Sequence, residues 1–220
     1  MIKKLWKEFI SSPVPTIAKW QNKRFLWLLM AIVTLGLVFV AHFLFQDYVY
    51  MLPCEQCVYI RYAFFVMFFA GVIAAINPKK IILKIIGYIL GFYGSIIGIG
   101  YSLTLNNIHH AAHSPDPEAM FGVQGCSAEP SFPFGLPLDK WFPGWFQPTG
   151  DCGFDNPMVP DGVVLEGIRK AMVDFYNDGW YLIPSHHFMN MAQACLLAYV
   201  ICLVILIAMA ASWIYQAIKK

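Results

Sequence analysis

The sequence predicts an all-α membrane protein: a bundle of four transmembrane helices with a long outer loop that contains a short interfacial helix. Composition is the first observation, because 59% of the 220 residues are hydrophobic and only 13% are charged, whereas about a quarter are charged in soluble proteins. The second is a set of four apolar runs, each close to the roughly 20 residues that a helix needs to cross a bilayer. The third is the clustering of Lys and Arg at particular ends of those runs.

Residues 1–24 form a basic N-terminal segment, with six Lys and Arg residues against one acid. A weak amphipathic face near its start is made of Leu5, Trp6, Phe9 and Ile10. The segment therefore either lies on the membrane surface or is a solvated tail. Residues 25–45 follow as an apolar run of 21 residues, which predicts the first span. This run is too long for the core of a signal peptide and no small-residue cleavage pattern follows it, so we expect an uncleaved helix.

The second and third spans are predicted over residues 58–76 and 81–105. Asn77-Pro78 ends the second span, because the residue before a proline is disfavoured in a helix. The third span carries four glycines spaced four, three and four residues apart, on one ridge that a neighbouring helix can approach closely. They are Gly87, Gly91, Gly94 and Gly98. We expect these glycines to pack helices together and to have no catalytic role.

Residues 106–188 form the long loop, with ten acids against three bases and a formal charge of −7 when His is neutral. Apolar residues recur at helical spacing over 161–177, which predicts a helix lying flat on the outer leaflet. The stretch 131–148 is rich in Pro, Phe and Trp. It predicts irregular backbone that places its aromatic side chains in the membrane interface. The fourth span is predicted over residues 189–214, and residues 215–220 form a basic tail.

The bases also predict how the chain crosses the membrane. Eleven of the 15 Lys and Arg residues flank the N-terminus, the turn between the second and third spans, and the C-terminus. The positive-inside rule assigns those segments, and both termini, to the cytoplasm. The link between the first two spans and the long loop then face outward. In a bacterium this describes a multi-pass protein of the inner membrane whose outer side is the oxidising periplasm, where disulfides persist.

The main chemical motif lies at the outer head of the second span and reads Pro53-Cys54-Glu55-Gln56-Cys57-Val58-Tyr59-Ile60-Arg61. Cys54, Cys57 and Arg61 fall on one face of a helix. Pro53 suits the first helical turn, so the positive end of the helix dipole is expected to favour thiolate at both cysteines. A guanidinium inside an apolar span is costly and by default marks a functional site. The motif therefore predicts an activated dithiol at a membrane surface.

A second cysteine pair, Cys126 and Cys152, lies in the outer loop. Alone, this pair would be interpreted as a structural disulfide. With a dithiol on the same side of the membrane, the two pairs can instead pass electrons by thiol–disulfide exchange. The last dithiol then needs a two-electron acceptor, for which a lipid quinone is the obvious candidate, and Arg61 can hold Cys57 as thiolate and donate to a quinone carbonyl. Cys195 and Cys202 lie inside the fourth apolar run and are expected to be apolar filling.

Other polar residues admit two interpretations each. His109, His110 and His113 could be zinc ligands with cysteine, but their spacing matches no standard finger and a role at a helix end fits better. His186 and His187 could polarise the head of a quinone or serve a proton step, but a structural role as partly exposed histidines fits better. Glu55 and Gln56 are expected to tune the redox poise of the dithiol between whose cysteines they lie.

The whole chain resembles the DsbB family, the bacterial inner-membrane quinone-linked oxidases of periplasmic thiol oxidases. The resemblance lies in four spans, a Cys-x-x-Cys at the outer head of the second, an Arg four residues on, and a cysteine pair in the loop before the fourth. Four stretches are similar to its DsbI branch: P-C-E-Q-C-V-Y-I-R-Y, G-V-Q-G-C, P-T-G-D-C-G and H-F-M-N-M-A-Q-A-C. The outer loop and the basic N-terminal extension are longer than in typical DsbB proteins, which affects partner choice more than chemistry.

The resemblance implies a role for each cysteine. Cys126 would form a mixed disulfide with a reduced partner, and Cys152 would be its pair and exchange with Cys54. Cys57 would pass electrons to ubiquinone or menaquinone, assisted by Arg61. The implied partner is a periplasmic thioredoxin-fold thiol oxidase of the DsbL or DsbA kind, and the DsbI branch serves DsbL, which is associated with an arylsulfate sulfotransferase. Membrane lipid and quinone are the other expected partners, and nucleic acid is not expected.

Two other classes compete with this interpretation. One is a metal-binding membrane protein that uses the cysteine pairs and the loop histidines as ligands. The other is an enzyme similar to vitamin K epoxide reductase, also a small helical bundle with active cysteines. That similarity would place the active Cys-x-x-Cys in a late span, whereas here the motif opens the second span, which argues against it.

Overall fold

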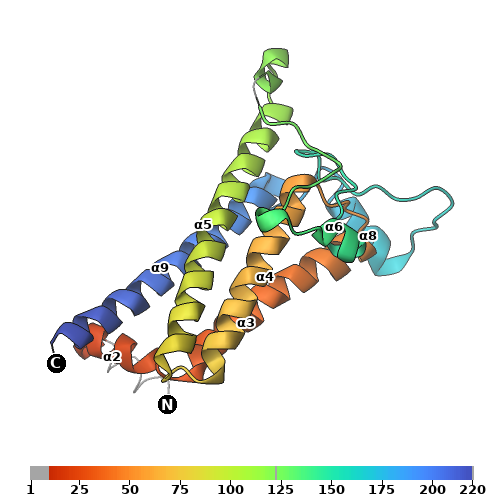
Figure 1. Ribbon diagram of the computed structural model, residues 1–220. Helices are drawn as coiled ribbons and strands as arrows, with labels where there is room; N and C mark the ends of the chain where they lie inside the picture. The colour runs from red at the N-terminus through yellow and green to blue at the C-terminus, as the bar shows by residue number, and fades with distance from the viewer. Residues whose placement is uncertain (1–9, 122, 220) are drawn as a thin grey trace. The chain divides into compact units, whose positions relative to one another are not determined.

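The computed structural model describes residues 10–121 and 123–219. Four helices in this part of the chain are long and apolar enough to cross a membrane. The first joins α3 (Arg24–Phe39) to the π-helix η1 (Val40–Tyr48), and the others are α4 (Glu55–Ile76), α5 (Ile81–Ala112) and α9 (Met191–Ile218). The predicted class, a helical membrane protein with four spans, is confirmed (Figure 1).

The helices extend beyond the apolar runs from which the spans were predicted. The largest difference is at α5, which continues to Ala112, whereas the apolar run ends at Leu105. Asn106, His109 and His110 are therefore helical. Helix formation depends on backbone hydrogen bonding and not on hydrophobicity, so a helix can continue through polar residues outside the apolar layer.

The described part of the chain divides into two compact units, and the first comprises residues 10–35, 64–96 and 199–219. Its core is centred on Trp27, Tyr88 and Leu206, all nearly inaccessible to solvent. The indole N–H of Trp27 donates to the carbonyl of Gln21 at 2.9 Å, and the Tyr88 hydroxyl donates to the Gln21 side chain at 2.6 Å. The Trp27 indole and the Tyr88 hydroxyl are thus paired, as burial requires, whereas Nε2 of Gln21 is buried without a hydrogen-bond partner.

The N-terminal segment contributes the helix α2 (Pro13–Trp20) to this unit. Thr16 and Ala18 are buried, and Ile17 packs against the core. Residues 13–20 therefore form a helix packed on this core, so a solvated tail is wrong for that part, whereas a position on the membrane surface stays a prediction. The predicted amphipathic face is made of Leu5, Trp6, Phe9 and Ile10, of which the first three lie outside the described residues.

Glycines allow helices of this unit to approach closely. A Cβ atom added to Gly87 would lie 2.6 Å from the Cβ of Ala74, and one added to Gly91 would lie 3.1 Å from Leu206. At Gly71 the added atom would meet the carbonyl oxygen of Trp27 at 2.6 Å. The predicted packing role is confirmed for Gly87 and Gly91, because any larger side chain would separate the helices.

The second unit comprises residues 36–63 and 97–198 and contains every cysteine except Cys202. Its loop is built from short elements: η2 (Pro117–Met120), η3 (Pro133–Gly135), α6 (Leu138–Trp141), α7 (Pro143–Phe146), α8 (Gly167–Phe175) and η4 (Pro184–His186). Two strands, β1 (Tyr181–Ile183) and β2 (Phe188–Asn190), form an antiparallel hairpin in which Tyr181 pairs with Asn190. No strand was predicted there, since three-residue strands carry too little alternation to detect.

The predicted helix of the loop is α8, which lies within 161–177. Its buried side is Val173, which packs with Val49 and Met51, whereas Ile168 and Phe175 are exposed. A second apolar face left open to the surroundings is typical of a helix at a membrane surface.

The irregular backbone expected over 131–148 is wrong in part. This stretch contains α6 and α7, and Phe132 and Phe146 are buried inside the unit. Phe132 packs edge-on against Tyr59 and Phe146, with ring centroids 5.3 and 5.6 Å away. These two rings therefore attach the loop to α4, whereas Phe134, Trp141 and Phe142 are exposed.

Candidate redox-active site

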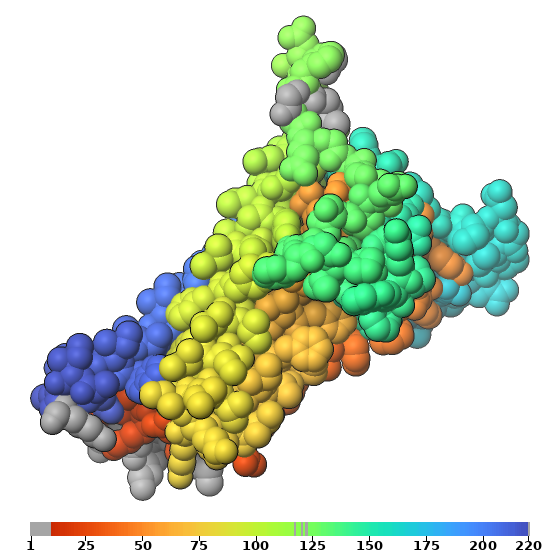
Figure 2. Space-filling view, viewed as in Figure 1, coloured from red at the N-terminus to blue at the C-terminus, as the bar shows by residue number. Residues whose placement is uncertain are grey.

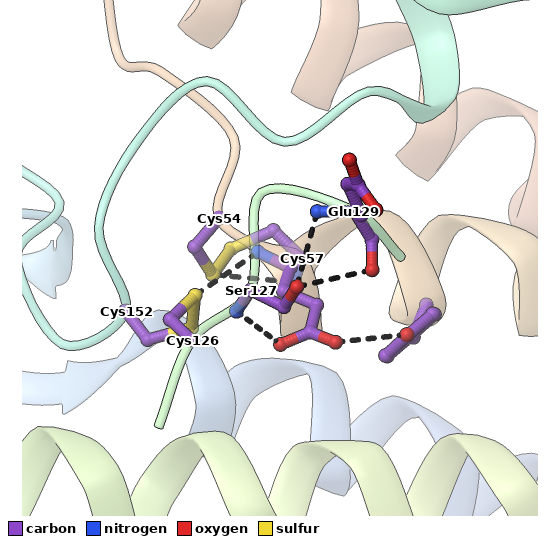
Figure 3. Close-up of a disulfide and its surroundings, with 8 residues drawn as sticks. Cys54, Cys57, Cys126, Ser127, Glu129 and Cys152 are labelled. Atoms are coloured by element: carbon purple, nitrogen blue, oxygen red, sulfur yellow. Dashed lines mark hydrogen bonds between the residues drawn. A yellow bond between two sulfur atoms is a disulfide. The ribbon is translucent and has the colours of Figure 1, made fainter. Parts of the chain in front are cut away.

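Four cysteines form two disulfides that lie side by side at the start of α4 (Figure 3). Cys54 is bonded to Cys57, with Cα atoms 5.0 Å apart, and Cys126 is bonded to Cys152, with Cα atoms 5.6 Å apart. The loop pair is thus brought against the Cys-x-x-Cys motif from 71 residues away in sequence, as the Glu55–Cys126 contact shows. Cys195 and Cys202 are free thiols in α9.

The first amides of α4 donate to a sulfur atom of each pair. The N–H of Cys57 donates to Sγ of Cys54 at 3.2 Å, and the N–H of Glu55 donates to Sγ of Cys126 at 3.4 Å. Because α4 begins at Glu55, Cys54 precedes the helix and Pro53 lies outside it, whereas Pro53 was expected in the first turn. Unpaired N–H groups and the positive dipole end at a helix start favour an anion there. Both sulfur atoms are therefore placed where a thiolate is stabilised.

Two attachments hold the arms of the outer disulfide on the head of α4. On the Cys126 arm, the N–H of Ser127 donates to a carboxylate oxygen of Glu55 at 2.8 Å. On the Cys152 arm, the N–H groups of Thr149 and Gly150 both donate to the carbonyl of Pro53, at 2.9 and 3.1 Å. Figure 2 shows the loop atoms, drawn green, lying over the orange head of α4. The outer pair is consequently held from both sides beside the inner one.

Arg61 lies one turn after Cys57 and is 6% exposed. Its Nη1 donates to Oε1 of Gln46 at 2.7 Å and to the carbonyl of Trp145 at 3.2 Å, and its Nη2 donates to the carbonyl of Ala41 at 3.5 Å. None of these three bonds reaches a sulfur atom, so the expected contact with Cys57 stays a prediction. Bonds to described residues use three of the five guanidinium N–H groups, which leaves two N–H groups for a further acceptor.

Aromatic rings gather on the indole of Trp145, the residue whose carbonyl accepts from Arg61. His42 stacks on Trp145 with ring centroids 3.8 Å apart, and Phe39 and Phe43 pack on the same indole. The other edge of His42 faces the carboxylate of Asp47 at 3.7 Å. A quinone head group has two carbonyl acceptors, and the remaining N–H groups of Arg61 are donors of the kind that such acceptors need. His42 and Gln46 were not identified from sequence, although a histidine inside an apolar run is itself a signal of function.

The loop histidines do not join the cysteines. His109 is buried and pairs with the side-chain amide of Asn190 at 3.3 Å, and His113 stacks on it with ring centroids 4.2 Å apart. His187 packs on Tyr181 within the β-hairpin. Over residues 10–121 and 123–219, no three His, Cys, Asp or Glu side chains are grouped in a way that could hold a metal ion. The arrangement therefore gives the metal-binding alternative no support.

Gln56 and Asp155 are further polar groups that are enclosed in this unit. Gln56 lines a pocket of about 310 Å³ with Tyr59, Tyr101 and Thr104, to which no cysteine contributes. Asp155 follows the outer pair, and burial raises the pKa of its carboxyl to about 6. Among the described residues, the hydrogen bonds to the cysteine sulfur atoms come from the N–H groups of Glu55 and Cys57, so a role for Gln56 in tuning the dithiol stays a prediction.

Comparison with known proteins identifies the family. The family model for the disulfide bond formation protein DsbB matches residues 23–210. The chain belongs to the DsbB family. Relatives named protein-disulfide oxidoreductase DsbI are 58% identical in Escherichia coli O6:K15:H31, over 99% of each chain, and 60% identical in Salmonella typhimurium, over 96% of this chain and 95% of the relative. A third DsbI, from Lelliottia amnigena, is 63% identical over 72% of each chain.

Membership of the DsbB family, and of its DsbI branch, agrees with the geometry of the site. The chain is an enzyme of disulfide bond formation, a protein-disulfide oxidoreductase. Its four apolar helices and its family make it a multi-pass protein of the inner membrane.

Proposed function

We propose that this DsbB-family chain is a protein thiol:quinone oxidoreductase. It reoxidises a periplasmic thioredoxin-fold thiol oxidase of the DsbA or DsbL kind and passes the electrons through both cysteine pairs to ubiquinone or menaquinone. The observation that carries the proposal is the contact of both disulfides with the first amides of α4. An isolated structural disulfide would have no reason to share a helix start with a second, adjacent pair.

The outer pair begins the reaction. A thiolate of the reduced partner attacks Sγ of Cys126, which forms a mixed disulfide and releases Cys152 as thiolate. The Cys152 thiolate attacks Sγ of Cys54, so a Cys152–Cys54 disulfide forms and Cys57 leaves as thiolate. The second thiol of the partner resolves the mixed disulfide, the partner leaves oxidised, and Cys126 is released as thiolate beside the N–H of Glu55.

Exchange then restores the outer pair. The Cys126 thiolate attacks Cys152, which reforms their disulfide and releases Cys54 as thiolate. The inner pair now holds both electrons from the partner. A quinone would be the oxidant that accepts these two electrons together with two protons, which restores the Cys54–Cys57 disulfide. Each step breaks one sulfur–sulfur bond for every one that forms, apart from the last, in which the electrons leave the protein.

Arg61 is the proposed quinone-binding residue. Its two remaining N–H groups can donate to a quinone carbonyl, and a fixed positive charge one turn from Cys57 favours the thiolate form of that cysteine. Gln46 and the carbonyl of Trp145 hold the guanidinium in place. Arg61 lies near the outer end of the span proposed over residues 58–76, so a lipid-soluble acceptor can approach it from the bilayer.

We further propose the orientation in the membrane. Residues 1–24, the turn at residues 77–80 and residues 215–220 lie in the cytoplasm, because they carry the excess of Lys and Arg. The spans approximate 25–45, 58–76, 81–105 and 189–214, and residues 106–188 are periplasmic. The active cysteines then face the compartment that contains the partner.

Turnover of purified protein with a reduced thioredoxin-fold partner and a soluble quinone tests the function. Cys54→Ser and Cys57→Ser are each expected to abolish quinone reduction while the protein stays folded. Cys202→Ser is the matched control, because this thiol is absent from the proposed route. Substantial quinone-dependent turnover in either inner-pair variant would contradict the assignment.

A non-reducing gel tests the order of exchange. Cys152→Ala removes the internal exchange partner, so Cys126 is expected to remain in a trapped mixed disulfide with a partner that has a single cysteine. The reciprocal variant, Cys126→Ala, is the control. An adduct that forms equally well through Cys152 would show that the order is wrong.

A further inference from the structure

We propose that Glu55 is a positioning residue for the transfer of electrons between the two cysteine pairs. Its carboxylate docks the segment that carries Cys126 onto the head of α4. This inference deepens the proposed function and rests on it, since it concerns the exchange step between the pairs. It adds a second role to the predicted one, in which Glu55 tunes the redox poise of the dithiol whose cysteines flank it.

Both oxygen atoms of the Glu55 carboxylate accept hydrogen bonds. Oε2 accepts from the N–H of Ser127, the residue after Cys126, at 2.8 Å (Figure 3). Oε1 accepts from the hydroxyl of Tyr59, one turn further along α4, at 2.9 Å. The Glu55 residue is 7% exposed, so these bonds are shielded from competing water.

Tyr59 extends the attachment along the same segment. Its hydroxyl accepts from the N–H of Ser131 at 2.7 Å while it donates to Glu55. Two main-chain amides of the segment 127–131 are thus bound by two side chains of α4. Together with the amide of Glu55 on Cys126 Sγ, they form a continuous set of contacts that we call the Glu55 clamp, made of Glu55, Tyr59, Ser127 and Ser131.

The buried carboxylate and the segment depend on each other. Among the described residues, the one ion pair within 4.0 Å joins His42 and Asp47, so Glu55 is held by neutral donors. A buried carboxylate needs hydrogen-bond donors, and bonds to an ionised acceptor are stronger than neutral ones. The ordered position of residues 127–131 therefore supplies what the charge requires, and the charge in turn fixes the segment.

Docking matters because Cys126 has to act after the partner has left. Its thiolate must attack the Cys152–Cys54 disulfide, which reforms Cys126–Cys152 and releases Cys54 as thiolate. A segment free of the clamp would sample many positions, whereas a docked one keeps the sulfur within reach at a high effective concentration. Loss of the clamp should therefore slow exchange and leave the reaction of the inner pair with quinone unchanged.

The experiment compares two assays on full-length protein in detergent. Turnover driven by the reduced partner uses both pairs. Quinone reduction driven by dithiothreitol, in a background with Cys126→Ser and Cys152→Ser, uses the inner pair alone. The test variants are Glu55→Ala, Glu55→Gln and Tyr59→Phe. Glu129→Gln is the matched control, because this residue is exposed in the same segment and bonds to the Ser127 hydroxyl through its main-chain N–H and carbonyl.

Glu55→Ala should lower the partner-driven kcat by about ten- to a hundredfold, the loss expected for one or two bonds to a buried charge. The partner-driven kcat of Glu55→Gln should lie between those of Glu55→Ala and wild type, because the amide oxygen still accepts one hydrogen bond. Tyr59→Phe should slow the same step and be non-additive with Glu55→Ala, as expected for members of one network. The KM for quinone and the dithiothreitol-driven rate should change by less than about twofold.

An unchanged partner-driven rate in Glu55→Ala would overturn the proposal. An equal fall in both assays would also overturn it, because Glu55 would then act on the inner pair or on folding. If Glu55→Ala does not fold, Glu55→Gln and Tyr59→Phe decide by the same comparison. Failure of the function itself would appear differently, as turnover that survives Cys54→Ser.

Discussion

Gly150 should speed electron transfer between the cysteine pairs, because it allows the Cys152 arm to contact the backbone before α4. A Cβ atom at this position would lie 2.6 Å from the carbonyl oxygen of Leu52, whereas ordinary contact begins at 3.4 Å. In Gly150→Ala the arm must therefore move by about 0.8 Å. That movement stretches both bonds to the Pro53 carbonyl, now 2.9 and 3.1 Å. Each such bond contributes about 1 kcal/mol.

We expect Gly150→Ala to slow exchange between the pairs by about ten- to a hundredfold, since a displacement of about 1 Å can cost that much in a reaction that depends on alignment. The assay follows the Cys152–Cys54 disulfide by rapid alkylation and peptide mass spectrometry after one equivalent of reduced partner is added. Gly125→Ala is the matched control, because it adjoins Cys126 and its added Cβ would meet nothing within 4 Å. If both variants exchange at the same rate, the contact with Leu52 does not position the arm.

Three further outcomes are expected. Arg61→Met should insert as well as wild type, because it removes a charge from an apolar span, but should raise the KM for quinone about tenfold; unchanged quinone kinetics would remove Arg61 from the site. Burial raises the pKa of Asp155 to about 6. The stability that protonated Asp155 contributes is therefore fully present below the pKa of an unfolded Asp, about 3.9, and is lost as the pH rises through 6. Asp155→Asn should thus raise the free energy of unfolding by about 1–2 kcal/mol at pH 7.5 and lose that advantage below pH 4, which thermal unfolding at both pH values checks. The acidic loop should make coupling to a partner with a basic active-site surface faster at low salt, and this gain should fade beyond ~0.15 M in stopped-flow measurements; no salt dependence would exclude such steering.

The parts of this protein that were predicted correctly depend on local patterns. Four runs of apolar residues are long enough to span a bilayer, and run length is visible without any knowledge of packing. The spacing of Cys57 and Arg61 likewise places them one turn apart on a helix, as they are on α4. The packing of Gly87 against Ala74 followed from glycine spacing alone.

The contacts that were missed join residues far apart in sequence. Arg61 binds a side chain 15 residues earlier and a carbonyl 84 residues later, and Glu55 binds an amide 72 residues later. No periodicity encodes such pairs, because they depend on how the loop packs after the helices have formed. The π-helical end of the first span, from which Gln46 bonds to Arg61, was not predicted either, because it also depends on packing between distant segments.

The most direct test of the account is a single-turnover experiment that reports the redox state of both cysteine pairs over time. Oxidised protein with bound quinone is mixed with one equivalent of reduced partner, quenched with an alkylating agent at increasing times, and analysed by peptide mass spectrometry. The account predicts that the Cys126–Cys152 disulfide opens first, that a Cys152–Cys54 disulfide rises and falls, and that quinone is reduced afterwards. A Cys126–Cys152 disulfide that stays intact while quinone is reduced would contradict it.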